Sequence, residues 1–530
     1  MPVARPIRIL LWLLLALVLA SAIAFVVVIA FPAPLQHWLE AHVVLALRQH
    51  YQSDVTLENL HIIVTPVIYA SADKLVVPNP ADPSLPPLIT VKHLALQAGL
   101  LQLLRTPVHI SQLKLDGLEI KVGPKRELAN NPGASSLRRQ AAPMSQPHRP
   151  IHLADFVIDQ VDADGAKLYI LRKDPAREPL LFDLRQLQLR SAGAGEAMQF
   201  TAALTNPTPP GVIESTGHFG PWRFGDPSLT PLGGHYRFEH ADLGVFNGIS
   251  GTLSSVGDYS GVLRNIVVDG TTDTPDFKLD RGGETVHLTT SFHAIVDGTN
   301  GNTYLQPVKA HFLDSEVVTK GEVAGHAGQK GKTITLDVDI QHARVEDVLA
   351  LAAKSEPALT GRLALAAKLK LPPGQEAVLQ RMELNGNFHV SGGRFTNQTV
   401  NKVVVELSRR GQGKPQDQSI TQVPAGLAGD FRFQSSTLTF SALQFTVPGA
   451  EAQFAGSYGL RGETLNFAGD VRLHATLSQV VGGGKGGLLS LFDPLFEKHG
   501  AGTYVPITIT GTREHPQIHV QWGKLFGGSG

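Results

Sequence analysis

The sequence repeats one eight-residue pattern that few folds can accommodate. Apolar residues occupy its first, third, sixth and eighth places, and a polar pair occupies the fourth and fifth. Period-two alternation indicates β-strands with one apolar face, and the polar pair interrupts that alternation once in each copy. The copies are 55-VTLENLHI-62, 89-ITVKHLAL-96, 108-VHISQLKL-115, 156-FVIDQVDA-163 and 182-FDLRQLQL-189.

The interruption constrains the shape of the sheet. A slip of one residue would turn every later apolar side chain toward water. A β-bulge that holds the polar pair outward absorbs the extra residue and bends the strand. Bulges at matching places in successive strands therefore predict a sheet that curves into a trough with an apolar inner face.

Two of the copies are similar over a longer stretch. Residues 108–122 and 156–170 align without a gap at a separation of 48, and Asp116-Gly117 falls on Asp164-Gly165. We interpret this similarity as an internal structural repeat. The two Asp-Gly steps are compatible with a second bulge or with tight hairpin turns.

Looser β-patterns continue along the chain. They cover 263–268, 334–340, 403–407 and 438–447, and glycine-bounded strands over 454–477 are typical of an antiparallel meander. Helical spacing of apolar residues predicts short amphipathic helices over 344–354 and 488–499. Polar, low-hydrophobicity composition predicts disordered excursions over 123–150 and 409–419.

The N-terminal region carries a long apolar run from Ile9 to Phe31. At about 1.5 Å per residue it is long enough to cross a hydrocarbon layer of about 30 Å. A cleaved signal peptide is the alternative, because Ala20-Ser21-Ala22 resembles a cleavage site. Basic residues precede the run, which predicts a cytoplasmic N-terminus and places the bulk of the chain across the membrane. An amphipathic helix is expected over 34–51.

The search for chemistry finds no catalytic or cofactor motif. The formal net charge is zero, which gives no indication of a nucleic-acid partner, and the absence of cysteine excludes disulfides and thiolate zinc sites. The run 325-GHAGQKGKT-333 ends like a phosphate-binding loop, but His326 stands where that loop needs glycine and strand-like sequence follows. His515 and His519 are four apart in extended sequence, where they are not neighbours. We therefore predict a protein that is not an enzyme and has no cofactor or metal.

These features together resemble the AsmA-like family of envelope proteins. The N-terminal likeness covers residues 1–122 and rests on the single span followed by 53–62 and 89–122, and the second likeness rests on 385–415, 448–460 and 493–520. The resemblance implies an elongated antiparallel curved sheet that forms a repeating β-groove, with an N-terminal transmembrane helix and a few short amphipathic helices. It also implies an inner-membrane protein, single-pass, with its bulk in the periplasm.

The expected organisation follows from these boundaries. We expect a tail and anchor over 1–31, a juxtamembrane helix and N-terminal β region over 32–122, a disordered loop over 123–150, a central β-groove over 151–380 and an AsmA-like C-terminal β region over 381–530.

The predicted function is binding or conduction of phospholipid along the apolar groove, in support of outer-membrane lipid homeostasis and assembly. The expected partners are phospholipid, the inner membrane, and outer-membrane or periplasmic proteins, with no nucleic acid. Acyl chains need a continuous apolar surface, which alternating strands supply on one face. The groove candidates are Val108, Ile110, Leu113, Leu115, Leu118, Ile120, Phe156, Ile158, Leu184, Leu187 and Leu189.

Two alternatives remain open from the sequence. The same apolar residues would also fill the core of a closed β-sandwich, with no space for a ligand. A scaffold or assembly factor for outer-membrane proteins or secretion, without lipid transfer, would use its sheet edges to capture client strands.

Overall fold

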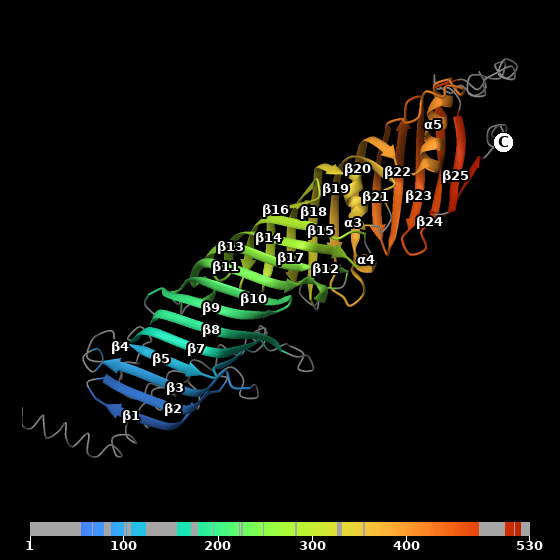
Figure 1. Cartoon of the computed structure of the whole chain (residues 1–530). Helices are drawn as coiled ribbons and strands as arrows, with labels where there is room; N and C mark the ends of the chain where they lie inside the picture. The colour runs from blue at the N-terminus through green and yellow to red at the C-terminus, as the bar shows by residue number, and fades with distance from the viewer. Residues whose placement is uncertain are drawn as a thin grey trace, which may run out of the picture. The chain divides into compact units, whose positions relative to one another are not determined.

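The fold is known from a computed structural model of the chain (Figure 1). It describes residues 55–122, 156–170, 179–475 and 504–520, apart from gaps at 66, 79–85, 100–101, 103–107, 194–195, 222, 224–225, 247, 281–282, 326–330, 353–355 and 514. The chain divides into two compact units, Met1–Tyr236 (unit 1) and Arg237–Gly530 (unit 2). Both consist mainly of β-strands, as the sequence predicts.

Unit 1 contains strands of widely different length, from three residues in β4 to 15 in β7. They are β1 Thr56–Val64, β2 Val67–Val77, β3 Ile89–Gly99, β4 Val108–Ile110, β5 Gln112–Asp116, β6 Glu119–Val122, β7 Phe156–Ile170, β8 Leu180–Gly193, β9 Met198–Pro207 and β10 Pro210–Phe219, followed by the short helix η3 Pro227–Leu229. The next strand, β11 Pro231–Asp242, contains the division between the units.

Most strands of unit 2 pair with their sequence neighbours, although β12 pairs with β14. The strands are β12 Ile249–Ser250, β13 Thr252–Val262, β14 Asn265–Leu279, β15 Val286–Asp297, β16 Asn302–Phe312, β17 Ser315–Gly325, β18 Lys332–Arg344, β19 Leu359–Leu371, β20 Glu383–Phe395, β21 Ala425–Gln434, β22 Thr437–Val447, β23 Ala450–Gly459, β24 Thr464–Leu473, β25 Tyr504–Thr512 and β26 Pro516–Val520. The helices are η4 Leu243–Val245, α3 Val345–Ala352, α4 Val378–Arg381 and α5 Gln398–Gly411.

The sheet is mixed, which corrects the prediction of a purely antiparallel one. Strands β4, β5 and β6 all run parallel to β7, with Val108 opposite Phe156 and Glu119 opposite Lys167. The register is the same separation of 48 that the repeat shows in the sequence. The two copies of the repeat are therefore neighbours in the sheet. A parallel neighbour needs a long connection that returns to the same end of the strand, and residues 123–155 join the two copies.

One set of skipped positions in unit 1 forms a line across the sheet, which we call the crease. The polar pairs of the copies 108–115 and 156–163 lie off this line, where Ser111, Asp159 and Ser191 face one another in a register that does not shift. The residues of the crease lie opposite one another from β2 to β8: Lys74, Lys92, Gly117, Gly165 and Arg185. Three of these crease residues have positive φ, namely Lys74 at 50°, Gly117 at 64° and Gly165 at 63°. Because neighbouring strands skip a residue at the same level, the apolar side chains stay on one face while the pairing register is kept.

The crease decides between the two interpretations of the Asp-Gly steps. Strand β7 continues through Gly165, and β5 and β6 on either side of Gly117 both pair with β3. Neither glycine therefore reverses the chain. The predicted register shifts are confirmed at Glu58 in β1 and at Arg185 facing β9. Lys92 lies in strand pairs that keep their register, because its neighbours skip with it.

Unit 2 absorbs the extra residue differently, with a bulge in every second strand from β14 to β22. The register shifts in each of these strands, while the odd-numbered strand beside it runs on without an extra residue at that level. Both residues of each bulge are exposed, so the polar face lengthens and the strand bends. The pairs are Pro275-Asp276, Gln306-Pro307, Gln341-His342, Ser391-Gly392 and Ser441-Ala442.

Glycines on the apolar face allow the backbones to approach closely. At each of five such positions an added Cβ would lie 2.0 to 2.2 Å from a carbonyl oxygen of the neighbouring strand. Such crowding marks places where a strand twists or bends too sharply for any side chain. The positions are Gly217 in unit 1 and Gly321, Gly386, Gly456 and Gly469 in unit 2.

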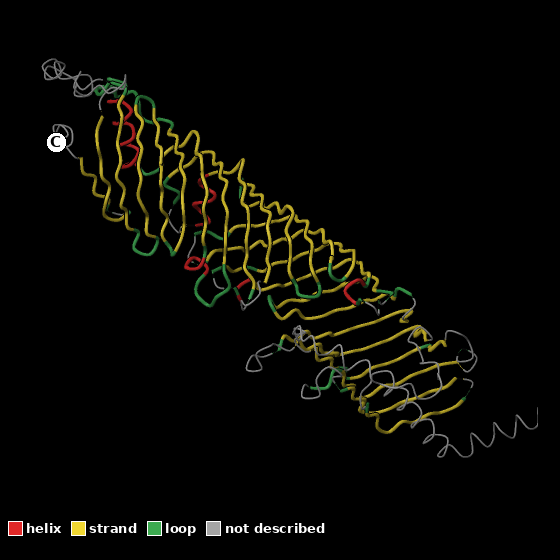
Figure 2. The backbone as a smooth tube through the Cα atoms, turned by 180° about the vertical axis from the view of Figure 1, so that it is seen from behind, coloured by secondary structure: helices red, strands yellow, loops and turns green. Residues whose placement is uncertain are grey.

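Helices α3 and α5 cover parts of the apolar face of unit 2 (Figure 2). The predicted helix over 344–354 is confirmed as α3. The strand predicted over 403–407 is wrong, because these residues lie in α5, and α5 also takes the first residues of the predicted excursion 409–419. Val404 and Val405 are buried in the helix, so packing against the sheet overrides the β-preference of the valine run.

Some predictions fall on residues outside the described part. These are the membrane span over 9–31, the helices over 34–51 and 488–499 and the loop over 123–150. Among the residues that the structure describes, no helix has the length and apolar content needed to cross a bilayer.

Candidate functional site

The apolar face of unit 1 is one continuous cluster on both sides of the crease. Val91, Leu118, Ala163 and Ala166 are buried there. Half-buried neighbours complete it: Leu75, Ile89, Leu94, Leu115, Ile120, Leu184 and Leu187. Residues before and after the skip therefore pack together, which is the arrangement that the repeated pattern predicts.

Five of the predicted groove residues lie in this cluster: Leu115, Leu118, Ile120, Leu184 and Leu187. Others follow the same strands further along. Leu113 and Leu189 lie on either side of the buried Val161, and Ile110 lies opposite Ile158. Val108 is half-buried on β4, and Phe156 is its partner on β7.

Sequence reasoning missed several members of the cluster. Val91 lies within a copy of the repeat and is only 2% exposed, although it is not among the predicted groove residues. Ala163 and Ala166 are small and bury little apolar area themselves. They belong to the cluster because larger side chains on neighbouring strands pack against them. Only the strand pairing reveals that contact.

A second cluster lies under α3 in unit 2. Val345 and the half-buried Val348 and Leu349 of the helix pack on β17 to β21, where Ile340 and Leu363 are buried. The other end of the helix reaches the β14–β15 connection, whose Gly283 and Glu284 amides donate to the carbonyls of Leu351 and Ala350 at 3.1 and 2.9 Å. Helix α3 therefore bridges strands that are not neighbours in the sheet.

A buried carboxylate fixes the start of α3. Asp347 is 6% exposed and accepts hydrogen bonds from the Ser315 hydroxyl at 2.6 Å and from the Asp314 amide at 3.1 Å. The Ser315 oxygen in turn accepts from the Arg344 amide at 2.9 Å. A carboxylate in the first helical turn also interacts favourably with the helix dipole.

The third cluster lies under α5. Val404 and Val405 pack against Val447, Ala450 and Val471 on the strands below. The fully buried Ser408 donates from its hydroxyl to the Pro448 carbonyl at 2.7 Å, which ties the helix to the end of β22. Both helices therefore cover strand ends and leave the middle of the strands to other side chains.

Phenylalanines occupy that middle part of the apolar face. Phe388, Phe431, Phe440 and Phe467 come from β20, β21, β22 and β24. Successive ring centroids lie 6.0 to 6.2 Å apart, from Phe431 through Phe388 and Phe440 to Phe467. Such tilted aromatic pairs add to the stability gained from burial. The row joins residues far apart in the sequence, so periodicity within a single strand does not reveal it.

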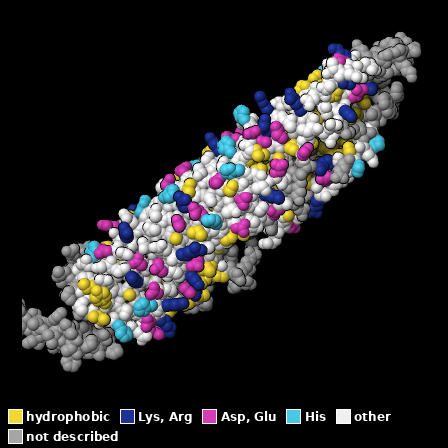
Figure 3. Space-filling view, in the orientation of Figure 1, with side chains coloured by type: hydrophobic (Ala, Val, Ile, Leu, Met, Phe, Trp, Pro, Cys, Tyr) yellow, Lys and Arg dark blue, Asp and Glu magenta, His cyan; other side chains and the backbone are white. Residues whose placement is uncertain are grey.

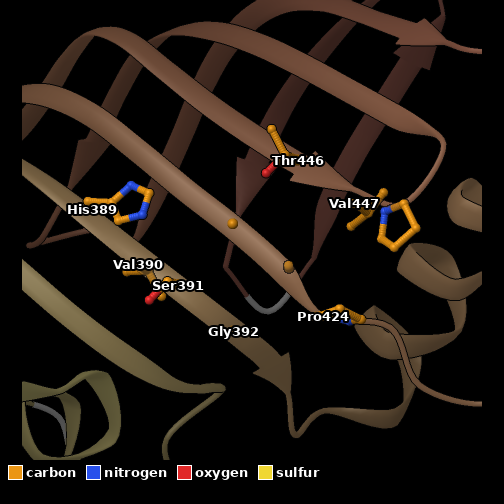
Figure 4. Close-up of a pocket in the computed structure, with 10 residues that line it drawn as sticks. His389, Val390, Ser391, Gly392, Pro424, Thr446 and Val447 are labelled. Carbon is orange, nitrogen blue, oxygen red and sulfur yellow. The ribbon is translucent and has the colours of Figure 1, made fainter.

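A pocket of about 280 Å³ opens between the ends of three strands of unit 2 (Figure 4). It is lined by His389, Val390, Ser391 and Gly392 of β20, by Pro424, Ala425 and Gly426 at the start of β21, and by Thr446, Val447 and Pro448 at the end of β22. None of the predicted groove residues lies in it.

The opposite face of the sheet is polar and carries cross-strand pairs of histidine and carboxylate (Figure 3). His93 lies 2.8 Å from Asp73, and His293 lies 2.7 Å from Asp269. Hydrogen bonds from His93 and Asn59 hold the pKa of the Asp73 carboxyl below its usual value. These pairs are exposed and connect adjacent strands, so they are part of the solvated face.

The described residues offer no metal centre, since no group of three or more histidine, aspartate or glutamate side chains among them is placed to hold an ion. The comparisons add no relative. No family model, no curated protein and no solved structure matches the chain.

Proposed function

We propose that the apolar face binds the acyl chains of phospholipid and lets them move along the sheet, within an inner-membrane-anchored envelope protein that supports outer-membrane lipid homeostasis and assembly. The resemblance to the AsmA-like family belongs to this proposal. The observation that carries it is the partial exposure of Leu115, Ile120, Leu184 and Leu187 on the apolar face of unit 1, which remain half-buried in the folded sheet.

The composition of the clusters supports an open face. In the described part of the chain, the members of all three clusters come from neighbouring strands of one sheet, from α3 or α5, or from connections beside them. A β-sandwich core would instead combine side chains from two facing sheets. The half-buried residues thus have a side turned toward a ligand or toward water.

The energetics favour an apolar occupant. Each methylene that leaves water completely gains about 0.8 kcal/mol. On a half-open face each methylene loses about half of its contact with water, so ten methylenes gain on the order of 4 kcal/mol. The members of the unit 1 cluster carry no titratable side chain, so this surface imposes no headgroup chemistry on such a ligand. Polar headgroups can remain in solvent at the strand ends.

Photocrosslinking from neighbouring positions of β8 tests the proposal. A photoreactive residue replaces either the half-buried Leu187 on the apolar face or the exposed Gln186 on the polar face, in cells with radiolabelled lipid. We expect lipid adducts from position 187 and none from position 186. Equal labelling at the two positions, or no lipid at 187, would contradict lipid binding, and protein adducts at 187 would favour the scaffold function.

A charge substitution provides a functional test. Leu187→Asp should abolish the lipid adducts formed from a second photoreactive position on the same face, while the circular dichroism spectrum stays unchanged. Gln186→Asp is the matched control and should retain them. Loss of the lipid adducts in both variants would indicate that the added charge disturbs the sheet as a whole.

A further inference from the structure

One end of unit 1 exposes apolar side chains where the chain carries no charge. The hairpin of β1 and β2 presents Ile63 at 62% exposure and Tyr69 at 47% exposure, and the two residues are direct cross-strand partners. Val67 begins β2 beside them and is half-buried. Figure 3 shows apolar side chains gathered at the end of the surface where β1 and β2 lie in Figure 1.

The absence of charge extends over neighbouring segments. No Asp, Glu, Lys or Arg occurs between Glu58 and Asp73, or between Lys92 and Arg105. The second stretch includes the end of β3, which pairs with the start of β2 through Val67 and Gly99. Elsewhere the polar face carries cross-strand ion pairs, so this uncharged end differs from the rest of that face.

We propose that the β1–β2 hairpin end lies in the interface of a lipid bilayer. Tyrosine suits this position, because its ring is apolar and its hydroxyl remains at the level of the headgroups. Transfer of an exposed isoleucine side chain from water into the bilayer interface is favourable, because its apolar surface leaves water. We take the occupant to be a bilayer because the hairpin end carries no Asp, Glu, Lys or Arg and the chain before β1 contains the predicted membrane span.

The preceding chain permits this placement. β1 begins at Thr56, and the apolar run predicted to span a membrane ends at Phe31. Residues 32–54 can extend on the order of 30 Å even at the rise of a helix, which is comparable to the length of β1 at about 3.3 Å per residue. The hairpin end can therefore reach the same bilayer as the predicted span. This inference does not depend on lipid lying in the groove.

The cysteine-free sequence makes a direct test possible. Ile63→Cys in the full chain introduces a single thiol for an environment-sensitive fluorophore, and Leu313→Cys is the matched control. Leu313 is an apolar side chain at 54% exposure in the β16–β17 turn of unit 2. The labelled chains are reconstituted into phosphatidylethanolamine–phosphatidylglycerol vesicles. Quenching is measured with aqueous iodide and with spin-labelled acyl chains.

We expect the probe at position 63 to be quenched several-fold less by iodide than the probe at 313, and to be quenched by the spin-labelled lipid. Tyr69→Cys should behave like position 63. Equal iodide quenching at 63 and 313 would overturn the proposal. Protection from both quenchers would also overturn it, because it would show that protein covers the hairpin. A chain that fails to associate with the vesicles would refute it as well.

Discussion

Deletion of Arg185 tests the role of the crease directly. Arg185 is the exposed extra residue of β8 and lies opposite Gly165 of β7. Without it, β8 loses its skip while β7 keeps its own. Leu187 and Leu189 must then turn to the polar face, or the preceding part of the strand must turn instead.

The cost follows from the side chains that change face. Complete burial of a leucine is worth about 1.5–3 kcal/mol, so two half-buried leucines together lose about 1.5–3 kcal/mol. Gln188 would turn inward, and burying its amide costs about 1–3 kcal/mol more. We therefore expect the deletion to lower the free energy of unfolding of unit 1 by roughly 2.5–6 kcal/mol.

Urea unfolding followed by circular dichroism measures this loss. Arg185→Ala keeps the residue count and is the control, with an expected change within about 0.5 kcal/mol because the side chain is exposed. If the deletion is as stable as Arg185→Ala, the crease does not hold the apolar residues on one face, and the explanation of the repeated pattern fails.

Three further predictions concern individual contacts. Asp347→Ala removes the acceptor for the buried Ser315 hydroxyl and should destabilise unit 2 by about 2–4 kcal/mol in urea unfolding, since a buried partner loses its charged acceptor; a loss below about 1 kcal/mol would show that water replaces the carboxylate. Ser408→Ala removes the hydroxyl that donates to the Pro448 carbonyl and should cost about 1–3 kcal/mol in the same assay, and an unchanged midpoint would contradict the tie between α5 and β22. Because the folded pKa of Asp73 lies below its ordinary value of 3.8, its contribution is fully present above pH 3.8 and is lost as the pH falls through the lower folded value. Asp73→Asn should therefore reduce stability at neutral pH and show a smaller further loss below pH 3.8, which acid unfolding curves measure; parallel acid limbs would exclude this contribution.

The sequence predicts the strands and the one-residue skips, because alternation is a local property of each strand. The alignment of the skips is not local. Lys74, Gly117 and Gly165 reach the same line only through strand registers, and one of those registers is parallel. The separation of 48 between the two copies equals the register of that parallel pairing. The sequence does not show, however, that the two copies are neighbours in the sheet.

The candidate site shows the same division between local and distant information. Leu184 and Leu187 could be assigned to one face from their spacing around a polar pair. The row that includes Phe388 and Phe440 could not be found in this way, since each strand contributes a separate ring. The valine run at 403–407 favours a strand locally, but contact with the sheet below stabilises a helix instead.

The order of the strands has a consequence for how the chain acquires its structure. In the described parts of each unit, most strands pair with the strand that comes next in the sequence. Such short-range pairing lets each new strand add to a finished edge as synthesis proceeds, with little entropy lost in closing loops. The exceptions in unit 1 are the pairing of β3 with β5 and β6 and the parallel pairing of β7 with β4, β5 and β6. We therefore expect folding during synthesis to stop at the parallel pairing until β7 has been made. Assembly of the sheet then continues.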